Sequence, residues 1–201
     1  MIEIKKNIAV LLLVMAGLTA CDMFATRNPE EPDSGKSSFI PPTSPSIVVS
    51  NFISAVAEKN VENYLLCLSD TVQSDKFYFN FKSTADAFAL YSSIFVNWSR
   101  HSERNYFNKL ITNMPKEVYP KISLNNTRFE VLLPDSAIFV ADYDLKVEHL
   151  INSVNKHFNG RLQFSIFPRE NGLWSIKSWY DYDVIQDTIQ SWSFLKAQLA
   201  N

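Results

Sequence analysis

The order of hydrophobic periodicities along the chain constrains the fold more than any other sequence feature. In the first half, apolar residues such as Val48, Phe52 and Val56 recur at the spacing of one helix face. In the second half, apolar and polar residues alternate with a period of two, which is typical of strands buried on one face. Helices followed by strands joined through short turns predict an α+β domain, in which the helices pack on one face of an antiparallel sheet.

The helical half predicts three helices. Ser44 and Pro45 supply an N-cap and a favoured first residue for a helix that ends near Lys59. A second, shorter helix is expected over residues 61–68 and a long third helix over residues 85–112. The spacing places six large residues on the inner face of the third helix: Phe88, Tyr91, Phe95, Trp98, Tyr106 and Leu110.

The strand half predicts an antiparallel meander. Asn159-Gly160 and Asn171-Gly172 are strong turn signals. An aromatic alternation at residues 77–81 predicts a short strand or extended segment before the meander. The strands and the final helix of this half are expected around residues 128–133, 139–148, 162–166, 174–180 and 187–199.

Successive side chains of a strand point alternately inward and outward, and we call this assignment the parity of the strand. Parity decides which polar side chains can reach the interior. On the long strand, Tyr143 faces inward with the apolar residues, whereas Asp142 and Asp144 face water. On the last strand, the same alternation places Ser178 and Tyr180 inside. The inner faces are therefore expected to hold no carboxylate, unless a one-residue bulge shifts the register.

The first 21 residues resemble the signal of a bacterial lipoprotein. Lys5 and Lys6 precede an apolar run that is too short to span a bilayer comfortably. The tetrapeptide Leu18-Thr19-Ala20-Cys21 then resembles a lipobox, in which a signal peptidase cuts before a lipid-modified cysteine. The similarity implies a signal peptide over residues 1–20 and a diacylglycerol anchor on Cys21. An N-terminal transmembrane anchor is the alternative.

An acylated Cys21 would hold the protein on the lipid bilayer of a bacterial cell envelope, facing the periplasm or the cell surface. Residues 21–43 are polar and rich in proline and serine, which predicts a flexible tether. A single α+β domain is then expected over residues 44–201. Asp22 resembles an inner-membrane retention signal of enterobacteria, and the choice between the two membranes stays open.

The composition excludes several classes of function. A formal net charge of -2 does not provide the basic surface that nucleic-acid binding requires, so no nucleic-acid partner is expected. With 4 glycines in the chain, glycine-rich phosphate loops are excluded, and no cofactor is expected. Cys67 lies within an apolar pattern and has no disulfide partner if Cys21 is lipidated. A buried and inert thiol is therefore expected.

The element order is similar to that of the nuclear transport factor 2-like superfamily, also described as SnoaL-like or ketosteroid-isomerase-like. The similarity rests on residues of the first two helices and of the last strand: Val48, Val49, Phe52, Ala55, Asn60, Tyr64, Leu66, Gly172, Leu173, Trp174, Ser175, Ile176, Trp179 and Asp181. The resemblance implies a cone-shaped, cystatin-like roll, in which a curved sheet wraps around a long helix and leaves a pocket. The long third helix and the extra C-terminal helix depart from the commonest pattern and could fill or cover that pocket.

The resemblance to enzymes implies an acid, a base or a hydrogen-bond donor at an inward position of the pocket. The candidate catalytic residues are Asp142, Asp144 and Tyr143, and the two aspartates reach the interior only through a bulge. For ligand binding, an aromatic set is expected: Tyr91, Phe95, Trp98, Tyr143, Trp174 and Tyr180.

Two polar groups outside the predicted strands are interpreted as structural. His101 and Glu103 are expected at an exposed helix end, since no third ligand accompanies them, and no metal site is expected. The acidic cluster at residues 181–187 contains no glycine for a calcium loop, so it is expected to cap the final helix. Tyr180 and Tyr182 beside these acids offer a polar-aromatic binding lip as the alternative.

The sequence is compatible with three functions. The first is a non-catalytic, membrane-tethered lipoprotein that binds a small apolar ligand or another envelope protein. The second is a SnoaL-like or isomerase-like enzyme with an inward aspartate. The third is a structural module, with the cone filled by side chains and the outer sheet pairing in a homodimer. An empty apolar cavity between the third helix and the sheet would indicate a ligand, and a filled one would indicate a scaffold.

Overall fold

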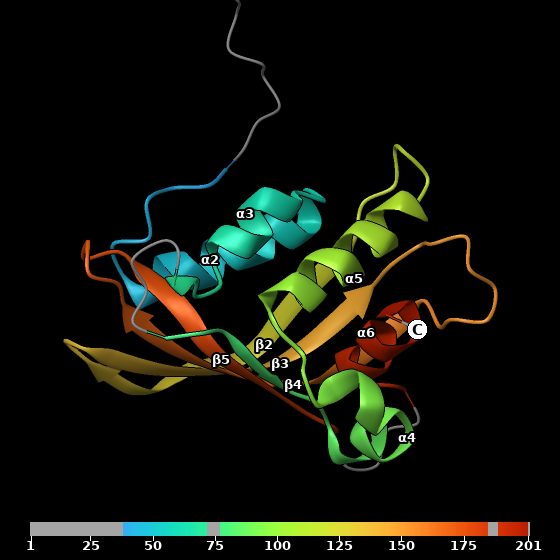
Figure 1. Cartoon of the computed structure of the whole chain (residues 1–201). Coiled ribbons are helices and arrows are strands. Elements are labelled where there is room, and N and C mark those ends of the chain that lie inside the picture. The colour runs from blue at the N-terminus through green and yellow to red at the C-terminus, as the bar shows by residue number, and fades with distance from the viewer. Residues whose placement is uncertain (1–37, 72–76, 185–188, 201) are drawn as a thin grey trace, which may run out of the picture. The chain divides into compact units, whose positions relative to one another are not determined.

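Five strands form the sheet of the computed structural model, which describes residues 38–71, 77–184 and 189–200 (Figure 1). Their order across the sheet is β1-β5-β4-β3-β2. Strands β2, β3, β4 and β5 form an antiparallel meander, as the alternation predicted, whereas β1 runs parallel to β5 at one edge. The strands are β1 (Asn80–Lys82), β2 (Lys121–Leu133), β3 (Ser136–Lys146), β4 (His157–Pro168) and β5 (Trp174–Tyr182).

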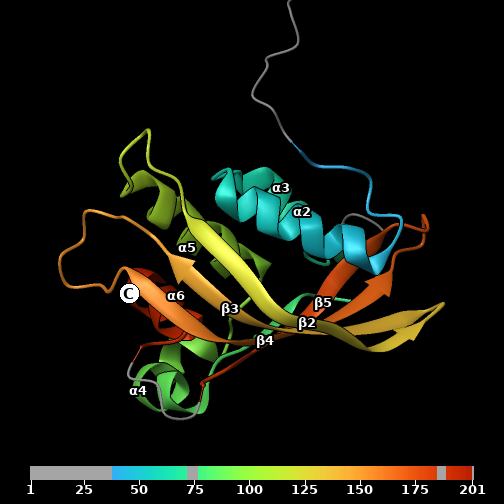
Figure 2. The ribbon, with the colours of Figure 1, turned by 180° about the vertical axis from the view of Figure 1, so that it is seen from behind.

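Helices α2, α3 and α5 lie over one face of the curved sheet, which we call the inner face (Figures 1 and 2). The predicted α+β class with helices packed on a curved sheet is confirmed. Ser44 caps α2 by accepting the N–H of Ile47, and Asn60 caps α3 by accepting the N–H of Asn63. The helices are α2 (Pro45–Ala57), α3 (Val61–Leu66), α4 (Ala85–Phe95), α5 (Arg100–Thr112) and α6 (Trp192–Ala200).

The long third helix predicted over residues 85–112 is wrong, because two separate helices occupy this stretch. Ser99 is extended, with φ of -128° and ψ of 177°, and it forms a capping box with Ser102 at the start of α5. Such a cap satisfies the first N–H groups of a new helix and so competes with continuing the previous one. The apolar periodicity continues without interruption from α4 into α5, so it does not indicate a break between them.

The turn predicted at Asn159-Gly160 is also wrong, because both residues lie inside β4. Gly160 pairs with Tyr143 of β3, and a Cβ at this position would clash with the Tyr143 hydroxyl oxygen. The glycine therefore permits a close approach between side chain and backbone rather than a reversal of the chain. The second predicted turn is confirmed at Gly172, where φ is +79° and the N–H donates to the carbonyl of Arg169.

A bulge in β5 overturns the predicted parity of the last strand. Ser178 pairs with Ser165, but Ile176 pairs with Ile166, so β5 carries one extra residue between these pairs. Beyond the bulge, Trp179 and Asp181 face inward instead of Ser178 and Tyr180. The expectation of an inner face without a carboxylate is therefore wrong, since Asp181 is 2% exposed.

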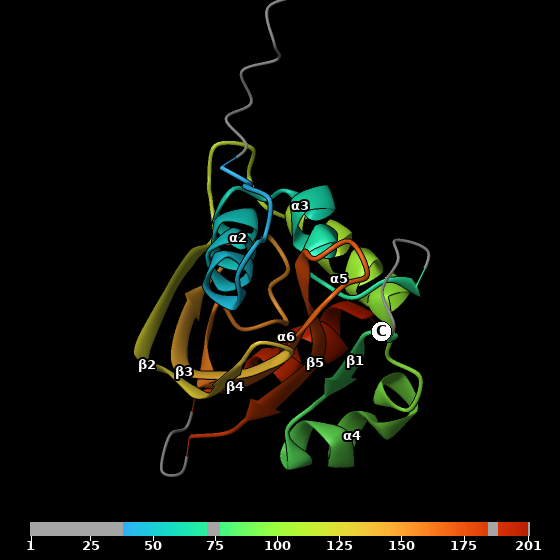
Figure 3. The ribbon, with the colours of Figure 1, turned by 90° about the vertical axis from the view of Figure 1, so that its left-hand side faces the viewer.

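Helix α6 packs against α4, α5 and β4, and it lies within the curve of the sheet (Figure 3). Trp192 at its start contacts the inner-face rings of Phe52, Tyr143 and Trp179 at centroid distances of 6.0, 5.5 and 4.8 Å. An apolar stripe on one side was predicted, yet residues on nearly every side of α6 are buried. The extra C-terminal helix thus fills the space between the sheet and the other helices.

The described residues belong to one compact unit, Ser37–Asn201. Cys21, the predicted signal peptide and most of the predicted tether lie outside the described residues, as does Asp187. No helix within the described ranges is both long and apolar enough to cross a membrane. Cys67 is buried as expected, and burial raises the pKa of its thiol to about 12, which keeps it unreactive at neutral pH.

Candidate functional site

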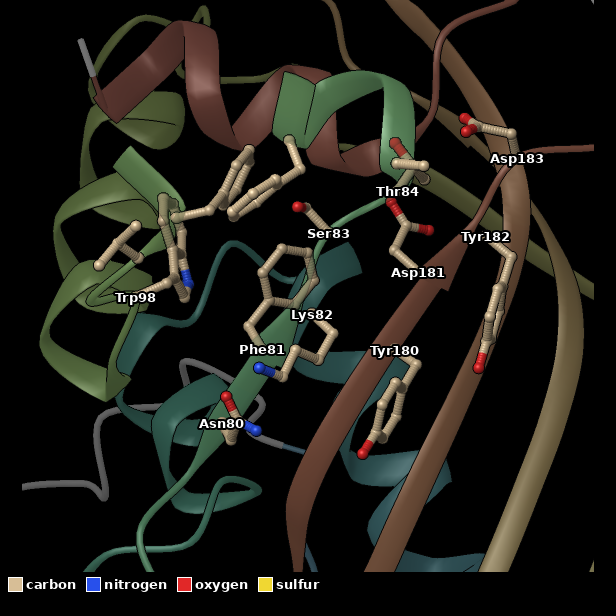
Figure 4. Close-up of a pocket in the computed structure, with 14 residues that line it drawn as sticks. Asn80, Phe81, Lys82, Ser83, Thr84, Trp98, Tyr180, Asp181, Tyr182 and Asp183 are labelled. Atoms are coloured by element: carbon tan, nitrogen blue, oxygen red, sulfur yellow. The ribbon is translucent and has the colours of Figure 1, made fainter. Parts of the chain in front are cut away.

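A pocket of about 800 Å³ lies between α4 and the edge of the sheet formed by β1 and β5 (Figure 4). One wall is the continuous segment 80–85, which runs from β1 into the first turn of α4. The other walls come from the end of α4 and from the last residues of β5. We call this the α4 pocket, and its lining residues are Asn80, Phe81, Lys82, Ser83, Thr84, Ala85, Phe88, Phe95, Val96, Trp98, Tyr180, Asp181, Tyr182 and Asp183.

The apolar wall of the α4 pocket is a cluster of three buried rings. Phe81, Phe95 and Trp98 contact one another with centroid distances of 5.5 to 5.9 Å. Toward solvent, this wall continues into Phe88 and Val96, which are 46% and 66% exposed. Buried rings with exposed apolar neighbours give a ligand both a rigid surface and an open path to it.

The opposite side of the α4 pocket is polar. Tyr180 and Tyr182 come from β5, and Lys82 pairs with Tyr180 across the parallel strands. Burial raises the pKa of Asp183, and the nearby charge of Asp86 raises it further. This combination of phenol, ammonium and carboxyl groups provides hydrogen-bonding partners for the polar end of an otherwise apolar ligand.

Asp181 is the buried acid of the α4 pocket, and its side chain lies on the pocket side of β5, beside Thr84 (Figure 4). Its Oδ1 accepts the hydroxyl of Tyr143 at 2.8 Å. Its Oδ2 accepts the N–H and the hydroxyl of Ser193 at 2.8 and 2.5 Å. Burial raises the pKa of Asp181 to about 6, and these hydrogen bonds oppose the shift.

Asp181 and Tyr143 together cap α6. The N–H of Trp192 donates to the Tyr143 hydroxyl at 2.7 Å, and the next N–H donates to Asp181. Two of the N–H groups that a helix leaves without an internal partner are thus satisfied by side chains of the sheet. The expectation that the acidic cluster caps the final helix holds for Asp181, although the cap acts from β5 and not from the preceding residue.

Glu103 is a second buried carboxylate, and the expectation of an exposed helix end is wrong for it. Its exposed fraction is 0%, whereas His101 on the same helix is exposed. The hydroxyl of Tyr64 and the indole N–H of Trp98 each donate to Glu103 at 2.7 Å. The ammonium of Lys196 on α6 forms a buried ion pair with the same carboxylate. Glu103 thus ties α6 to α3 and α5.

The three candidate catalytic residues lie on opposite faces of β3. Asp142 accepts a hydrogen bond from Arg161 at 2.7 Å, and Asp144 contacts His157 at 2.6 Å, both on the outer face. Hydrogen bonding to Arg161 lowers the pKa of Asp142. Tyr143 lies on the inner face, and burial raises its pKa well above the ordinary value, with the charge of Asp181 adding to the rise. The predicted parity of β3 is therefore confirmed, and no bulge brings the two aspartates inward.

The aromatic residues expected to bind a ligand are divided among several places. Phe95, Trp98 and Tyr180 line the α4 pocket. Tyr91 contacts Phe194 of α6, and Tyr143 is in the core beside Trp192. Trp174 is buried near the start of β5 and does not line this pocket.

Four residues have a larger role in the interior than the sequence predicted: Phe81, Glu103, Asp181 and Lys196. Glu103 and Lys196 occur in helical segments where a charge normally faces water. Asp181 was expected in an acidic cluster that caps the final helix, but the bulge that turns it inward has no sequence marker. Among the described residues, no three histidine, cysteine or acidic side chains come together as a metal site.

The chain shares its fold with solved structures of NTF2-like and cystatin-like proteins. A candidate dehydratase of the NTF2-like family from Streptomyces avermitilis matches with a TM-score of 0.50 and 11% identity, over 70% of this chain and 93% of that chain. An uncharacterized protein with a cystatin-like fold from Caulobacter vibrioides matches with a TM-score of 0.50 and 14% identity, over 71% and 88%. No protein-family model and no curated protein matches the sequence. The similarity establishes the fold class, and function has to be argued from the site.

Proposed function

We propose that this protein is a lipid-anchored, non-catalytic binding protein of a bacterial cell envelope, and that the α4 pocket holds a small apolar, ring-containing ligand. The anchor is inferred from the lipobox-like tetrapeptide ending in Cys21. Binding is inferred from the three-ring wall of the pocket and from its volume of about 800 Å³, which is within the range of small-molecule sites.

One observation carries the non-catalytic part of this proposal: among the residues that the structure describes, both buried carboxylates already bind groups of the protein itself. Asp181 accepts from Tyr143 and Ser193, and Glu103 accepts from Tyr64, Trp98 and Lys196. A general acid or base needs a free position within hydrogen-bond reach of its substrate. Each of these carboxylates already accepts three bonds, out of about four that its oxygens can accept, and the bonds from Ser193 and Lys196 hold α6 in place.

A binding experiment tests the proposal with two variants of the same helix. Phe88 lines the pocket and Leu90 does not, although both are exposed on α4. Aromatic and acyl compounds that raise the melting temperature of the full chain should bind Phe88→Asp at least about tenfold more weakly, which corresponds to about 1.4 kcal/mol. Leu90→Asp should bind them as the wild type does.

Two results of this experiment would contradict a small-ligand function. One is that no compound binds the wild type. The other is that the two variants lose affinity equally, which would indicate a general effect of charge on α4. Crosslinking in cells that captures another envelope protein at Phe88 would instead favour a protein partner for the same surface.

A second candidate function is proton transfer by Asp181. A buried carboxylic acid with a pKa of about 6 beside an aromatic pocket has the properties of a general acid or base at neutral pH. In that case a compound bound in the α4 pocket would be converted by the wild type and bound without conversion by Asp181→Asn. If the wild type binds but converts none of its ligands, the non-catalytic function stands.

A further inference from the structure

The ammonium group of Lys196 lies in a cage of aromatic rings inside the fold. The side chain is fully buried on α6. Its Nζ is 3.5 Å from the ring centroid of Trp179 and 3.7 Å from that of Phe81. The rings of Trp98 and Tyr106 follow at 5.6 and 5.7 Å. All four distances are within the roughly 6 Å over which a ring face attracts a cation.

Glu103 supplies the negative charge of this cage, and other elements orient it. Tyr64 of α3 and Trp98, which lies between α4 and α5, donate hydrogen bonds to its two oxygens. Glu103 also lies in the first turn of α5, where the helix dipole favours a negative charge. The carboxylate and all four rings therefore come from parts of the chain other than α6, which contributes Lys196.

The cage has the chemistry of a cation receptor rather than that of a packed core. Burial lowers the pKa of Lys196, whereas the ion pair with Glu103 opposes this shift and favours the charged ammonium. Replacing a buried ion pair with apolar side chains of similar volume is often neutral or stabilising. An apolar side chain at this position would also pack α6 against the core, whereas the four ring faces and the carboxylate around Lys196 suit an ammonium group in particular.

We propose that Glu103, Phe81, Trp98, Tyr106 and Trp179 form an ammonium-binding site, which the chain's own Lys196 occupies as an internal ligand. The ligand class is a primary alkylammonium ion, because the site offers one anionic acceptor surrounded by ring faces. This site adjoins the α4 pocket, but it does not depend on the function proposed for that pocket. Phe81 and Trp98 contribute to both, but Lys196 is enclosed and the pocket is open.

The test truncates the Lys196 side chain and supplies a small alkylammonium ion from solution in its place. Lys196→Ala leaves a space that n-propylammonium matches, since this ion carries the three carbons and the nitrogen that the substitution deletes. Increasing n-propylammonium should raise the melting temperature of the full-chain variant, following the stabilisation expected for a ligand that binds only the folded state. The wild type should not respond, because its site is filled.

Three controls separate ammonium recognition from the filling of a cavity. Neutral 1-propanol has nearly the same shape and should stabilise Lys196→Ala much less. Lys196→Met fills most of the space without a charge, so it should not respond to n-propylammonium. Adding Glu103→Gln to Lys196→Ala should weaken n-propylammonium binding at least about tenfold.

The proposal can be tested whether or not Lys196→Ala folds by itself. If Lys196→Ala is unfolded alone, recovery of its near-UV circular dichroism with n-propylammonium and not with 1-propanol supports the site. Equal effects of the amine and the alcohol would overturn it, because they would show cavity filling only. No response of Lys196→Ala to the amine, in melting temperature or in near-UV circular dichroism, would overturn it as well.

Discussion

Asp181 shows how one residue can hold an element that lies far from it in sequence. Its carboxylate and the Tyr143 hydroxyl satisfy the first two N–H groups of α6, so the final helix is anchored to the sheet. Holding α6 with a buried aspartate has an electrostatic cost, because burial disfavours the charged form of Asp181. Stability should therefore depend on pH through this residue.

Asp181→Asn should remove a pH dependence of the free energy of unfolding. The pKa of Asp181 is about 6 in the folded state against an ordinary 3.8, so the folded chain binds the proton more tightly. The contribution is complete below pH 4, falls as pH rises to 6, and amounts to about 3 kcal/mol in all. Urea denaturation between pH 4 and 7 measures the slope.

Asp142→Asn is the matched control for this slope. Arg161 lowers the pKa of Asp142, so that residue contributes stability that is present at neutral pH and lost in acid, which is the opposite sign. Its replacement should leave the fall between pH 4 and 6 in place. An unchanged slope in Asp181→Asn would show that another group titrates.

At the scale of elements, the break between α4 and α5 decides where the buried acid lies. Ser99 starts a new helix, and Glu103 then falls in its first turn, directed toward α6. A single straight helix over residues 85–112 would have set a different direction for its second half. The cap therefore positions Glu103 as well as starting α5.

Ser99→Ala should lower the free energy of unfolding by about 1 kcal/mol, the usual value of an N-cap. The reason is that the capping box with Ser102 is lost and the first N–H groups of α5 lose a partner. Chemical denaturation measures the change. Ser92→Ala, at an exposed position of α4, should cause no loss. Equal effects of both changes would mean that Ser99 acts through general helix propensity.

At the scale of the whole molecule, the inferred anchor and the folded unit have separate tasks. An acyl-modified Cys21 would keep the protein at the membrane, and the described unit would present the α4 pocket to the aqueous phase. In this proposal, membrane attachment depends on the lipid.

Cys21→Ser should abolish the incorporation of labelled palmitate and release the protein from the membrane fraction of its host. The physical reason is that the lipid is attached to the thiol, which the hydroxyl does not replace. Cys67→Ser is the control, because that thiol is buried and its pKa is raised to about 12. Retention of Cys21→Ser in the membrane fraction would favour an uncleaved N-terminal anchor.

Features of the fold that depend on nearby residues were predicted correctly, and features that depend on distant strands were not. Local patterns located α2, its Ser44 cap, the alternation of β3 and the turn at Gly172 correctly, because each depends on residues close together in the chain. The turn assigned to Asn159-Gly160 failed because that glycine is required by Tyr143 on the neighbouring strand. The parity of β5 failed because its bulge is defined by pairing with β4.

The α+β class, the aromatic core and the lipobox-like leader are readable from residue order alone, since hydrophobic period and short motifs are local properties. Residue order alone does not reveal that α6 fills the interior. It does not reveal the inward acids that hold α6 there either. Whether a charged side chain is solvated or buried depends on which distant groups meet it, and Glu103 meets Tyr64 and Lys196 only after the chain has folded.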